Sequence, residues 1–351
     1  MRLIEKVWFQ GHLAKWWLVP LLLPLMAIFA VLSFIRRLAY KLGLLKSVKM
    51  SVPIVVVGNI GVGGNGKTPV TLYLVEKFIE KGIQVGVVSR GYGSKAPHYP
   101  YQVHAASTAE QAGDEPLLIF QRSGVNVVIG SDRVAGCQLL IEQGCELIIA
   151  DDGLQHYRLA RDFEFVVVDG KRLFGNGLLL PAGPLRETTQ RLKRADCIIV
   201  NGESSWHKQV KNLTLPLLTM QLTANKVVNV KTGESVKLER FLTQYLDDTH
   251  KINALAGIGD PKRFFNTLEQ CGFSLAIVQG FVDHQTFTAD DLQLFSDDLP
   301  LLMTEKDAVK CVDFAQENYW YLPVDAVFSE STGRGYITAV ITKLVELVNK
   351  N

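Results

Sequence analysis

Four residues stand at the spacing of a loop that binds nucleoside triphosphates: Gly61, Gly66, Lys67 and Thr68 fit GxxxxGK[ST]. Glycines let the backbone N–H groups of such a loop curl around phosphate oxygens, Lys67 can reach the β- and γ-phosphates, and the Thr68 hydroxyl can ligate Mg²⁺. An apolar strand-like run precedes the loop and an amphipathic helix follows, so a chance glycine turn is the less favoured reading. The residues predicted to cradle the phosphates are Gly61, Val62, Gly63, Gly64, Asn65, Gly66, Lys67 and Thr68.

The middle of this loop separates the chain from one group of ATPases. Val62-Gly63-Gly64-Asn65 is similar to the start of the variant loop KGGxGK[ST], which dimer-forming ATPases carry. Those proteins use the first lysine of the variant across their subunit interface. Val62 stands at that position, so the sequence disfavours membership of the group.

Asp151 and Asp152 directly follow the apolar run ELIIA, where a metal-binding carboxylate of a nucleotide-hydrolysing fold is expected. The alternative is an ordinary turn at a strand end, because DDG is a favourable turn sequence. The phosphate loop upstream favours the metal role. Which of the two residues ligates the metal stays open.

A second acidic pair, Asp114 and Glu115, opens a predicted helix before Pro116, where N-capping alone would also explain it. Arg90 and Arg133 lie just beyond strand ends, and Arg186 lies in the loop PAGPLRE. Loops at the carboxyl ends of parallel strands line the ligand crevice, so these arginines can neutralise phosphate charge there. A solvated surface position is the alternative for each of them.

The elements that must position these groups alternate between strand and helix. Strands are predicted in IVVVGN (54–59), VGVVSRGYG (85–93, with its loop), VNVVIG (125–130), ELIIADDG (146–153), FEFVVVDG (163–170) and ADCIIVNG (195–202), with helical segments between the first four. This alternation predicts an α/β fold in which helices cover both faces of a parallel sheet, as in P-loop NTPases.

Four parts of the chain are predicted. They are a membrane anchor with a basic flank over 1–47, a P-loop domain over 48–216, a β-hairpin linker over 217–240 that turns at TGES, and a smaller α/β domain over 241–351. In the last part, WYLPVDAVF is predicted as one strand and YITAVITKLVELVNK as a closing helix.

The stretch from Trp16 to Ile35 carries no charged side chain, and its length of roughly 20 residues is enough to cross a bilayer. Trp16 and Trp17 at one end, and the basic residues after Ile35, are typical interface anchors. One alternative is a signal peptide. The other is a hairpin or an amphipathic helix lying on the membrane surface, because Pro20 and Pro24 interrupt the apolar run. The basic flank favours the cytoplasmic side for the segment that follows.

The composition excludes other classes of protein. A net charge of +2 offers no global attraction for nucleic acid. Five cysteines without a CxxC pair disfavour a disulfide framework or a zinc site and indicate a reducing compartment. No obligate protein partner is indicated.

Taken together, the motifs resemble one family, the tetraacyldisaccharide 4′-kinases, which are the lipid A 4′-kinases of Gram-negative bacteria. The resemblance covers nearly the whole chain: the N-terminal anchor, VPIVVVGNIGVGGNGKTP, SRGYG, GDEP, GSDR, DDGLQH, LPAGPLRE, AGIGDPKRFF, FVDHQTF and MTEKDAVK. It implies transfer of the γ-phosphate of ATP, with Mg²⁺, to the 4′-hydroxyl of a tetraacyl disaccharide 1-phosphate. It also implies an inner-membrane enzyme whose active site lies on the cytoplasmic face, with a P-loop kinase domain joined by a short β-linker to a smaller α/β domain.

The resemblance also implies roles for single residues. Lys67 and Thr68 with Asp151 and Asp152 would serve phosphate and metal. Asp114, paired with Glu115, would be the catalytic base, oriented by the histidine of the DH motif, His284. Arg133 matches a family arginine near the transferring phosphate. Further cleft residues, serving substrate or nucleotide, would be Gln155, His156 and Arg186.

One motif departs from the family pattern. A second histidine is expected after Asp283-His284, but Gln285 follows, and then Phe287 after one more residue. His284 is therefore the candidate from this motif, and a role for position 285 is in doubt. Lys306 in MTEKD is interpreted as a solvated residue at a helix start.

Two other functions are compatible with a phosphate loop. A P-loop regulatory ATPase that cycles at the membrane would turn over ATP without a lipid acceptor. A GTP-binding switch would carry an NKxD-type motif, which the sequence lacks. The second α/β domain with FVDHQTF favours a cleft that holds a separate acceptor.

Overall fold

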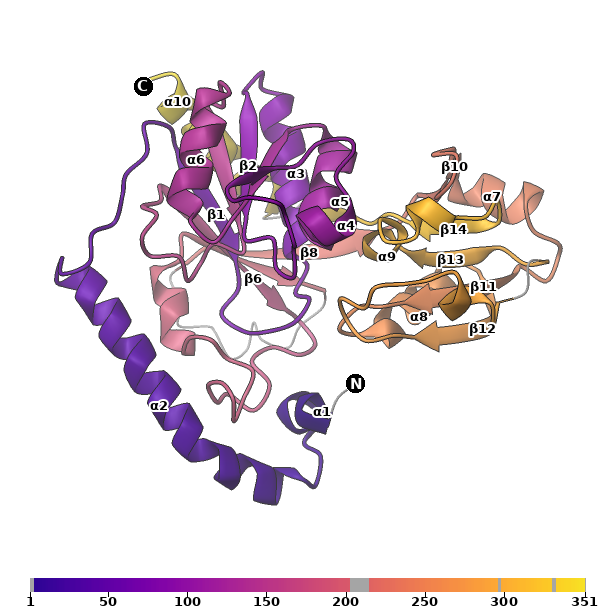
Figure 1. Cartoon of the computed structure of the whole chain (residues 1–351), viewed down its shortest axis with the longest axis horizontal. Coiled ribbons are helices and arrows are strands. Elements are labelled where there is room, and N and C mark those ends of the chain that lie inside the picture. The colour runs from indigo at the N-terminus through magenta and orange to yellow at the C-terminus, as the bar shows by residue number, and fades with distance from the viewer. Residues whose placement is uncertain (1–2, 203–214, 296–297, 330–332, 351) are drawn as a thin grey trace.

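The computed structural model describes residues 3–202, 215–295, 298–329 and 333–350, and they form two α/β domains and an N-terminal helical segment (Figure 1). The strands of the larger sheet are β1 (Ile54–Gly58), β2 (Val85–Ser89), β3 (Tyr101–Gln102), β4 (Asn126–Ile129), β5 (Leu147–Asp151), β6 (Phe163–Asp169), β7 (Cys197–Asn201), β8 (Leu217–Thr223) and β15 (Asp325–Phe328). Its helices are α3 (Lys67–Ile79), α4 (Ala109–Ala112), α5 (Asp114–Ser123), α6 (Arg133–Glu142), the 3-10 helix η1 (Thr189–Arg194) and α10 (Gly333–Val348).

The larger sheet has nine strands in the order β15-β8-β7-β6-β1-β5-β2-β4-β3. Neighbours from β8 to β4 are parallel, and β15 and β3 run antiparallel at the two edges. Along β1, Val55 and Val57 pack on one face while Ile54 and Val56 pack on the other. The pairing confirms the predicted parallel sheet. Burial on both faces explains why its strands are continuous apolar runs.

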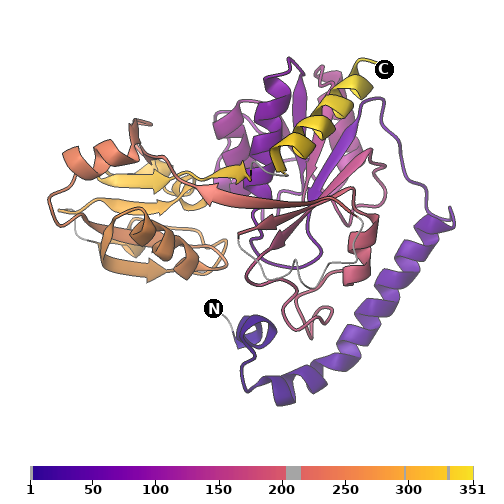
Figure 2. The same ribbon diagram turned by 180° about the vertical axis from the view of Figure 1, so that it is seen from behind.

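Helices cover both faces of this sheet, as predicted. Leu74 of α3, Leu117 of α5 and Ile337 of α10 share one hydrophobic cluster. Leu140 of α6 and Leu192 of η1 belong to the cluster on the opposite face. Figure 2 shows α10, in yellow, lying across the face of the sheet that is turned toward the viewer in that picture.

The smaller sheet has six strands in the order β10-β9-β14-β13-β11-β12. They are β9 (Lys226–Asn229), β10 (Ser235–Lys237), β11 (Lys251–Ala256), β12 (Ser274–Gly280), β13 (Leu301–Thr304) and β14 (Tyr319–Leu322). The helices are α7 (Leu238–Gln244), α8 (Pro261–Gln270), α9 (Glu305–Ala308) and the 3-10 helices η3 (Asp290–Leu292) and η4 (Val312–Phe314). We call residues 48–223 and 325–350 the large domain, and residues 224–324 the small domain.

The predicted linker hairpin over 217–240 is corrected by the strand pairing. β8 pairs with β7 and β15 in the large sheet, whereas β9 and β10 form the hairpin in the small sheet. β8 alternates buried residues with partly buried or exposed ones, so its pattern fitted either sheet. The connection between the domains is therefore the short stretch between β8 and β9.

The prediction that the chain ends inside the small domain is also wrong. The stretch WYLPVDAVF forms two strands, because Pro323 lacks the N–H that a continuous strand would need. β14 completes the small sheet, and β15 crosses back to pair with β8. The closing helix α10 then packs on the large domain, so two chain crossings connect the domains.

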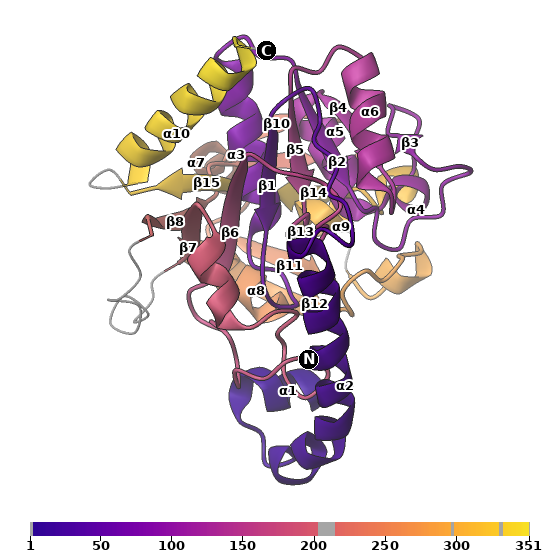
Figure 3. The same ribbon diagram turned by 90° about the vertical axis from the view of Figure 1, so that its left-hand side faces the viewer.

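The N-terminal segment contains α1 (Leu3–Gln10) and α2 (Lys15–Lys41). α2 has 27 residues and is long and apolar enough to cross a membrane. It contains Pro20 and Pro24 without interruption, so these prolines do not divide it as one alternative had it. Figure 3 shows α2 projecting away from both domains, and its large apolar side chains are exposed.

Candidate active site

A cavity of about 1000 Å³ lies where the carboxyl ends of the large-sheet strands face the small domain. The large domain lines it with Val62, Gly63, Gly64, Asn65, Gly66, Lys67, Thr68, Arg90, Tyr92, Asp114, Glu115, Asp152, Gln155, Arg172, Arg186 and Asn201. The small domain contributes Ile258, Gly259, Pro261, Arg263, Asp283, His284 and Lys306. Residues of α1 and α2 also reach it, among them Phe9, Phe29, Arg36 and Arg37. Most of the predicted site residues therefore meet in one place.

The phosphate loop runs from the end of β1 to the start of α3, as its spacing predicted. Gly63 and Gly66 have φ angles of 105° and 91°, in the left-handed region that favours glycine. A Cβ at Gly66 would also lie 2.5 Å from the Asn201 side chain. Lys67 and Thr68 open α3, so the positive end of the helix points into the cavity. Gly61 does not line this cavity and instead bridges to Leu185.

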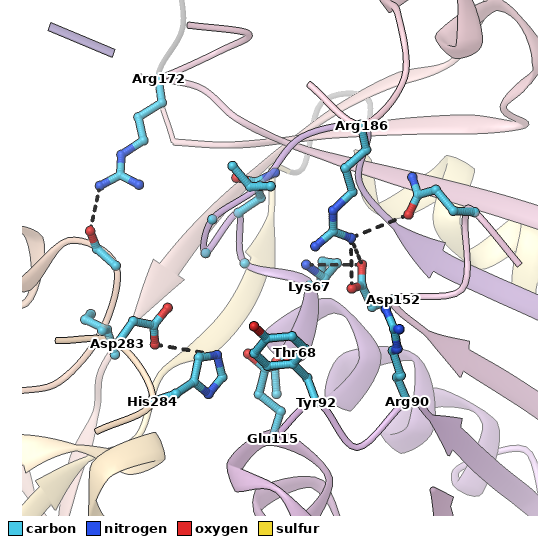
Figure 4. A pocket seen from close by; sticks show the side chains of 18 of the residues that line it. Lys67, Thr68, Arg90, Tyr92, Glu115, Asp152, Arg172, Arg186, Asp283 and His284 are labelled. Atoms are coloured by element: carbon cyan, nitrogen blue, oxygen red, sulfur yellow. Dashed lines mark hydrogen bonds and ion pairs between the residues drawn. The ribbon is translucent and has the colours of Figure 1, made fainter. Parts of the chain in front are cut away.

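Asp152 lies between two cations at the floor of the cavity (Figure 4). Lys67 Nζ is 3.5 Å from Asp152 Oδ1, and Arg186 donates to Oδ1 and Oδ2 at 3.2 and 3.0 Å. Burial would raise the pKa of this carboxyl, but Lys67 and Arg186 outweigh it and lower the pKa to about 2. Arg186 also contacts Gln155 Oε1, whose amide nitrogen donates to the Asn59 carbonyl.

Asp151, one residue earlier, lies in a very different environment. Its carboxyl is fully buried, and burial raises its pKa to about 7. Thr71 Oγ1 donates to Asp151 Oδ1 at 3.1 Å, while Oδ2 has no hydrogen-bond partner among the residues described. A buried, unpartnered carboxylate oxygen beside the phosphate loop suits a hard cation. The oxygen donors of Asp151, Asp152 and Thr68 therefore fit Mg²⁺.

Asp114 meets His284 across the cleft between the domains. Asp114 is the first residue of α5, after Gly113 with a φ of 84°, and His284 lies in the loop after β12 with a φ of 63°. His284 Nδ1 is 3.2 Å from Asp114 Oδ2, and its ring packs 5.3 Å from that of Tyr92. The carboxylate–histidine pair expected from the family resemblance is present in the structure.

Lys306 is a site residue that the sequence interpretation missed. Its side chain is 14% exposed and lines the cavity, rather than being a solvated residue at a helix start. Lys306 Nζ is 3.0 Å from Asp283 Oδ1, 3.4 Å from Glu115 Oε1 and 3.4 Å from His284 Nε2. Burial would lower its pKa, but these carboxylates raise it, so the ammonium stays charged. No local pattern separates this lysine from a solvated one.

Arg133 and His156 stand behind the cavity; like Gly61 and Asp151, neither is part of its lining. Arg133 is 3% exposed, and its guanidinium donates to the backbone carbonyls of Asp151 and Asp152 at 3.2 and 3.5 Å. Burial lowers its pKa to about 10. It therefore braces the strand end instead of facing a phosphate. His156 is also absent from the cavity lining, and burial together with Arg133 lowers its pKa to about 4.

Two further arginines, which the sequence did not single out, connect the domains at the cavity rim. Arg172 donates to the Gly259 carbonyl at 3.2 Å and is 3.1 Å from Asp260 Oδ2 (Figure 4). Arg263 of α8 reaches back to Asp169 Oδ2 at 2.9 Å and to the Asn201 amide oxygen at 3.0 Å. Their partners are distant in sequence, which is why spacing alone gave no signal.

Comparison with known proteins agrees with this geometry. The profile of a family described as tetraacyldisaccharide-1-P 4′-kinase matches residues 18–342. The chain is 58% identical over 331 residues to the tetraacyldisaccharide 4′-kinase of Colwellia psychrerythraea, covering 94% of this chain and 95% of that protein. It is 49% identical over 320 residues to the enzyme of the same name from Histophilus somni, covering 91% and 92%.

A solved structure extends the comparison to the fold. LpxK from Aquifex aeolicus, crystallised in complex with ATP, superposes with a TM-score of 0.75 at 28% identity, covering 93% of this chain and 99% of that one. The resemblance inferred from the motifs is confirmed by these matches. The chain belongs to the tetraacyldisaccharide 4′-kinase family.

Proposed function

We propose that this chain transfers the γ-phosphate of ATP to the 4′-hydroxyl of a tetraacyl disaccharide 1-phosphate. One observation carries the proposal: a phosphate loop with Lys67 and a carboxylate–histidine pair, Asp114 and His284, open into the same cavity. Phosphoryl transfer needs fixed positive charge around the phosphate and a base beside the acceptor hydroxyl. Membership of the family supports the identity of the donor and the acceptor.

In the proposed reaction, Asp114 accepts the proton of the acceptor hydroxyl. The acceptor oxygen bonds to the γ-phosphorus as the bond from that phosphorus to the ADP oxygen breaks. His284 orients the carboxylate through its contact at Oδ2. Lys67 and the N–H groups of the loop stabilise the charge on the phosphoryl oxygens, and Arg186 and Arg90 supply further positive charge at the cavity wall.

The metal expected for such a kinase fits the residues present. We assign Mg²⁺ to the oxygens of Thr68, Asp151 and Asp152, because Asp151 Oδ2 is buried close to Lys67 of the loop and has no hydrogen-bond partner among the described residues. Bound there with ATP, Mg²⁺ would neutralise part of the negative charge of the triphosphate. The unequal pKa values of the two carboxyls support different contacts for each.

The apolar helix α2 supports a membrane-anchored enzyme working on the cytoplasmic face. Phe29 and Ser33 of α2, and the basic residues Arg36 and Arg37 that follow, reach the cavity lining. Withdrawing acyl chains from the bilayer would cost about 0.8 kcal/mol for each CH₂ group. An anchored enzyme can leave the chains in the lipid and take only the phosphorylated sugar into its cavity.

The test is γ-³²P transfer from ATP–Mg²⁺ in detergent micelles, with and without a tetraacyl disaccharide 1-phosphate. The expected product is a newly labelled, doubly phosphorylated lipid. Asp114→Ala should slow its formation by at least about 100-fold, because the base is lost. Glu110→Ala, an exposed carboxylate on the neighbouring α4, is the matched control and should keep the wild-type rate. Free phosphate without labelled lipid would instead indicate a regulatory ATPase.

A further inference from the structure

Three sequence motifs of the small domain meet around one lysine that the proposed reaction does not use, Lys310. Its side chain is only 4% exposed. Lys310 Nζ is 3.0 Å from Asp307 Oδ1 and lies 5.1 Å from the centre of the Phe287 ring. Asp307 belongs to MTEKDAVK, Phe287 to FVDHQTF, and AGIGDPKRFF contributes Gly257. A buried ammonium is retained only where its charge is paired, so this lysine is held for its charge.

Asp307 fixes the position of that charge. Its side chain is fully buried, and its Oδ2 accepts hydrogen bonds from Thr304 Oγ1 at 2.5 Å and from the Gly257 N–H at 2.9 Å. A Cβ on Gly257 would lie 2.9 Å from both Asp307 Oδ1 and the Phe287 ring, which explains the glycine. Because Thr304 and Gly257 of the small domain bind Asp307 Oδ2, Asp307 Oδ1 is left to bind Lys310.

The charge of Lys310 is directed across the cleft at Asp114. Lys310 Nζ is 3.5 Å from Asp114 Oδ2, the same oxygen that His284 Nδ1 contacts at 3.2 Å. Lys306 is a second ammonium facing this carboxyl, and Glu115 is the neighbouring carboxylate on its own helix. Burial would raise the pKa of Asp114, but His284, Lys310 and Lys306 outweigh it and lower the pKa.

We propose that Lys310, clamped by Asp307, is a positioning residue that holds the Asp114 carboxylate in place and in its ionised form for the reaction. This rests on the proposed function, in which Asp114 is the base. Lys310 and His284 engage one oxygen of Asp114, and Asp114 lines the cavity where the acceptor hydroxyl must arrive. Since both holding groups come from the small domain, Asp114 becomes a competent base only when the two domains meet.

The experiment compares two variants whose effects should differ in kind. Lys310→Met removes the charge at similar length, so kcat for lipid labelling should fall at least about 10-fold while the KM for ATP changes little. The loss of kcat should be larger at low pH. The acid limb of the kcat profile, where kcat falls as pH decreases, should lie about one pH unit higher than in the wild type. Asp307→Asn keeps the lysine charge and leaves Asp114 as its carboxylate partner. Its acid limb should stay at or below that of the wild type.

Two controls separate positioning from a general structural effect. Arg122→Gln breaks another ion pair between the domains, the one with Glu305 of α9, the helix that also carries Asp307. It leaves the contacts of Asp114 in place. Its acid limb should match the wild type, and Lys310→Arg should restore most of the kcat lost in Lys310→Met. Thermal unfolding of each variant is measured alongside.

The outcomes distinguish the two proposals. Wild-type protein that labels no lipid overturns the kinase proposal and the role of Lys310 with it. Labelled lipid from the wild type, with Lys310→Met keeping the wild-type kcat and acid limb, overturns the role of Lys310 alone. That role is also overturned if Arg122→Gln or Asp307→Asn reproduces the acid-limb shift of Lys310→Met.

Discussion

At the scale of single residues, Asp151 and Asp152 show that two identical side chains, adjacent in the sequence, can lie in very different environments. Asp151 ends β5 and points into the large domain, where burial raises its pKa to about 7. Asp152 has a φ of 47° and turns toward Lys67 and Arg186, which lower its pKa to about 2 despite burial. Burial and ion pairing therefore shift the pKa values of the two carboxyls in opposite directions, which suits them to different contacts in the site.

The raised pKa of Asp151 predicts a stability change with a definite sign. A carboxyl whose folded pKa lies above its unfolded value destabilises the protein fully above the folded pKa, and this penalty fades as pH falls through it. Asp151→Asn should therefore raise the melting temperature of the metal-free protein at about pH 8, with a difference from the wild type that shrinks toward about pH 5. Thermal unfolding with a chelator measures it. Equal melting temperatures at both pH values would contradict the assignment.

At the scale of elements, α2 differs from every helix that covers the large sheet. Helices such as α3 bury an apolar stripe against the strands, whereas α2 has no buried residue along its length. Trp16 and Leu32 are 74% and 62% exposed. Short α1 ties the segment back to the large domain, because Trp8 Nε1 donates to the Pro181 carbonyl and Phe9 packs under Arg172. The apolar surface of α2 is thus available to lipid while the segment stays near the cavity.

Charged residues in the middle of α2 should therefore abolish membrane binding without unfolding the domains. The double variant Leu25→Asp and Ile28→Asp introduces two carboxylates at exposed apolar positions, each costing about 2.5 to 3.5 kcal/mol at a bilayer centre. Co-sedimentation with phospholipid vesicles should be lost, while ATP binding is retained. Glu76→Gln on α3 is a control away from this segment. Loss of ATP binding in the double variant would show that α2 belongs to the folded core.

At the scale of the whole molecule, the site exists only because two domains face each other across the cavity. Arg172 and Arg263 exchange contacts between the domains at its rim, and Lys306 and Lys310 of the small domain contact carboxylates of α5. The chain crosses between the domains twice, before β9 and after β14. Two crossings constrain how the domains can move more than one flexible linker would.

The contact that Arg263 makes with the large domain should affect the affinity for ATP. Arg263→Gln removes its hydrogen bonds to Asp169 and Asn201, beside the phosphate loop, and should weaken ATP binding about 5-fold. The partly exposed side chain keeps this effect moderate. Binding of a fluorescent ATP analogue measures it, with Lys262→Gln, the exposed neighbour on α8, as the control. Unchanged affinity in Arg263→Gln would argue against a nucleotide role for this rim.

Local sequence patterns were sufficient to predict the helices and strands around the phosphate loop and the loop itself. The strand β1, the glycines and the lysine are contiguous, so their chemistry follows from neighbours in the chain. Sheet membership was harder. The patterns of β8 and β15 are compatible with either sheet, and only the pairing between them assigned both to the large domain. The same long-range pairing carried α10 to that domain.

The sequence by itself determined that this chain has a parallel α/β domain with a nucleotide-binding loop, an apolar N-terminal helix and the motifs of its family. These depend on short-range periodicity and residue type. The tertiary structure alone decided that Arg133 stands behind the site, that Lys306 enters it, and that Lys310 reaches Asp114 from the other domain. Burial and charge pairing depend on which distant segments pack together, and no local spacing encodes that.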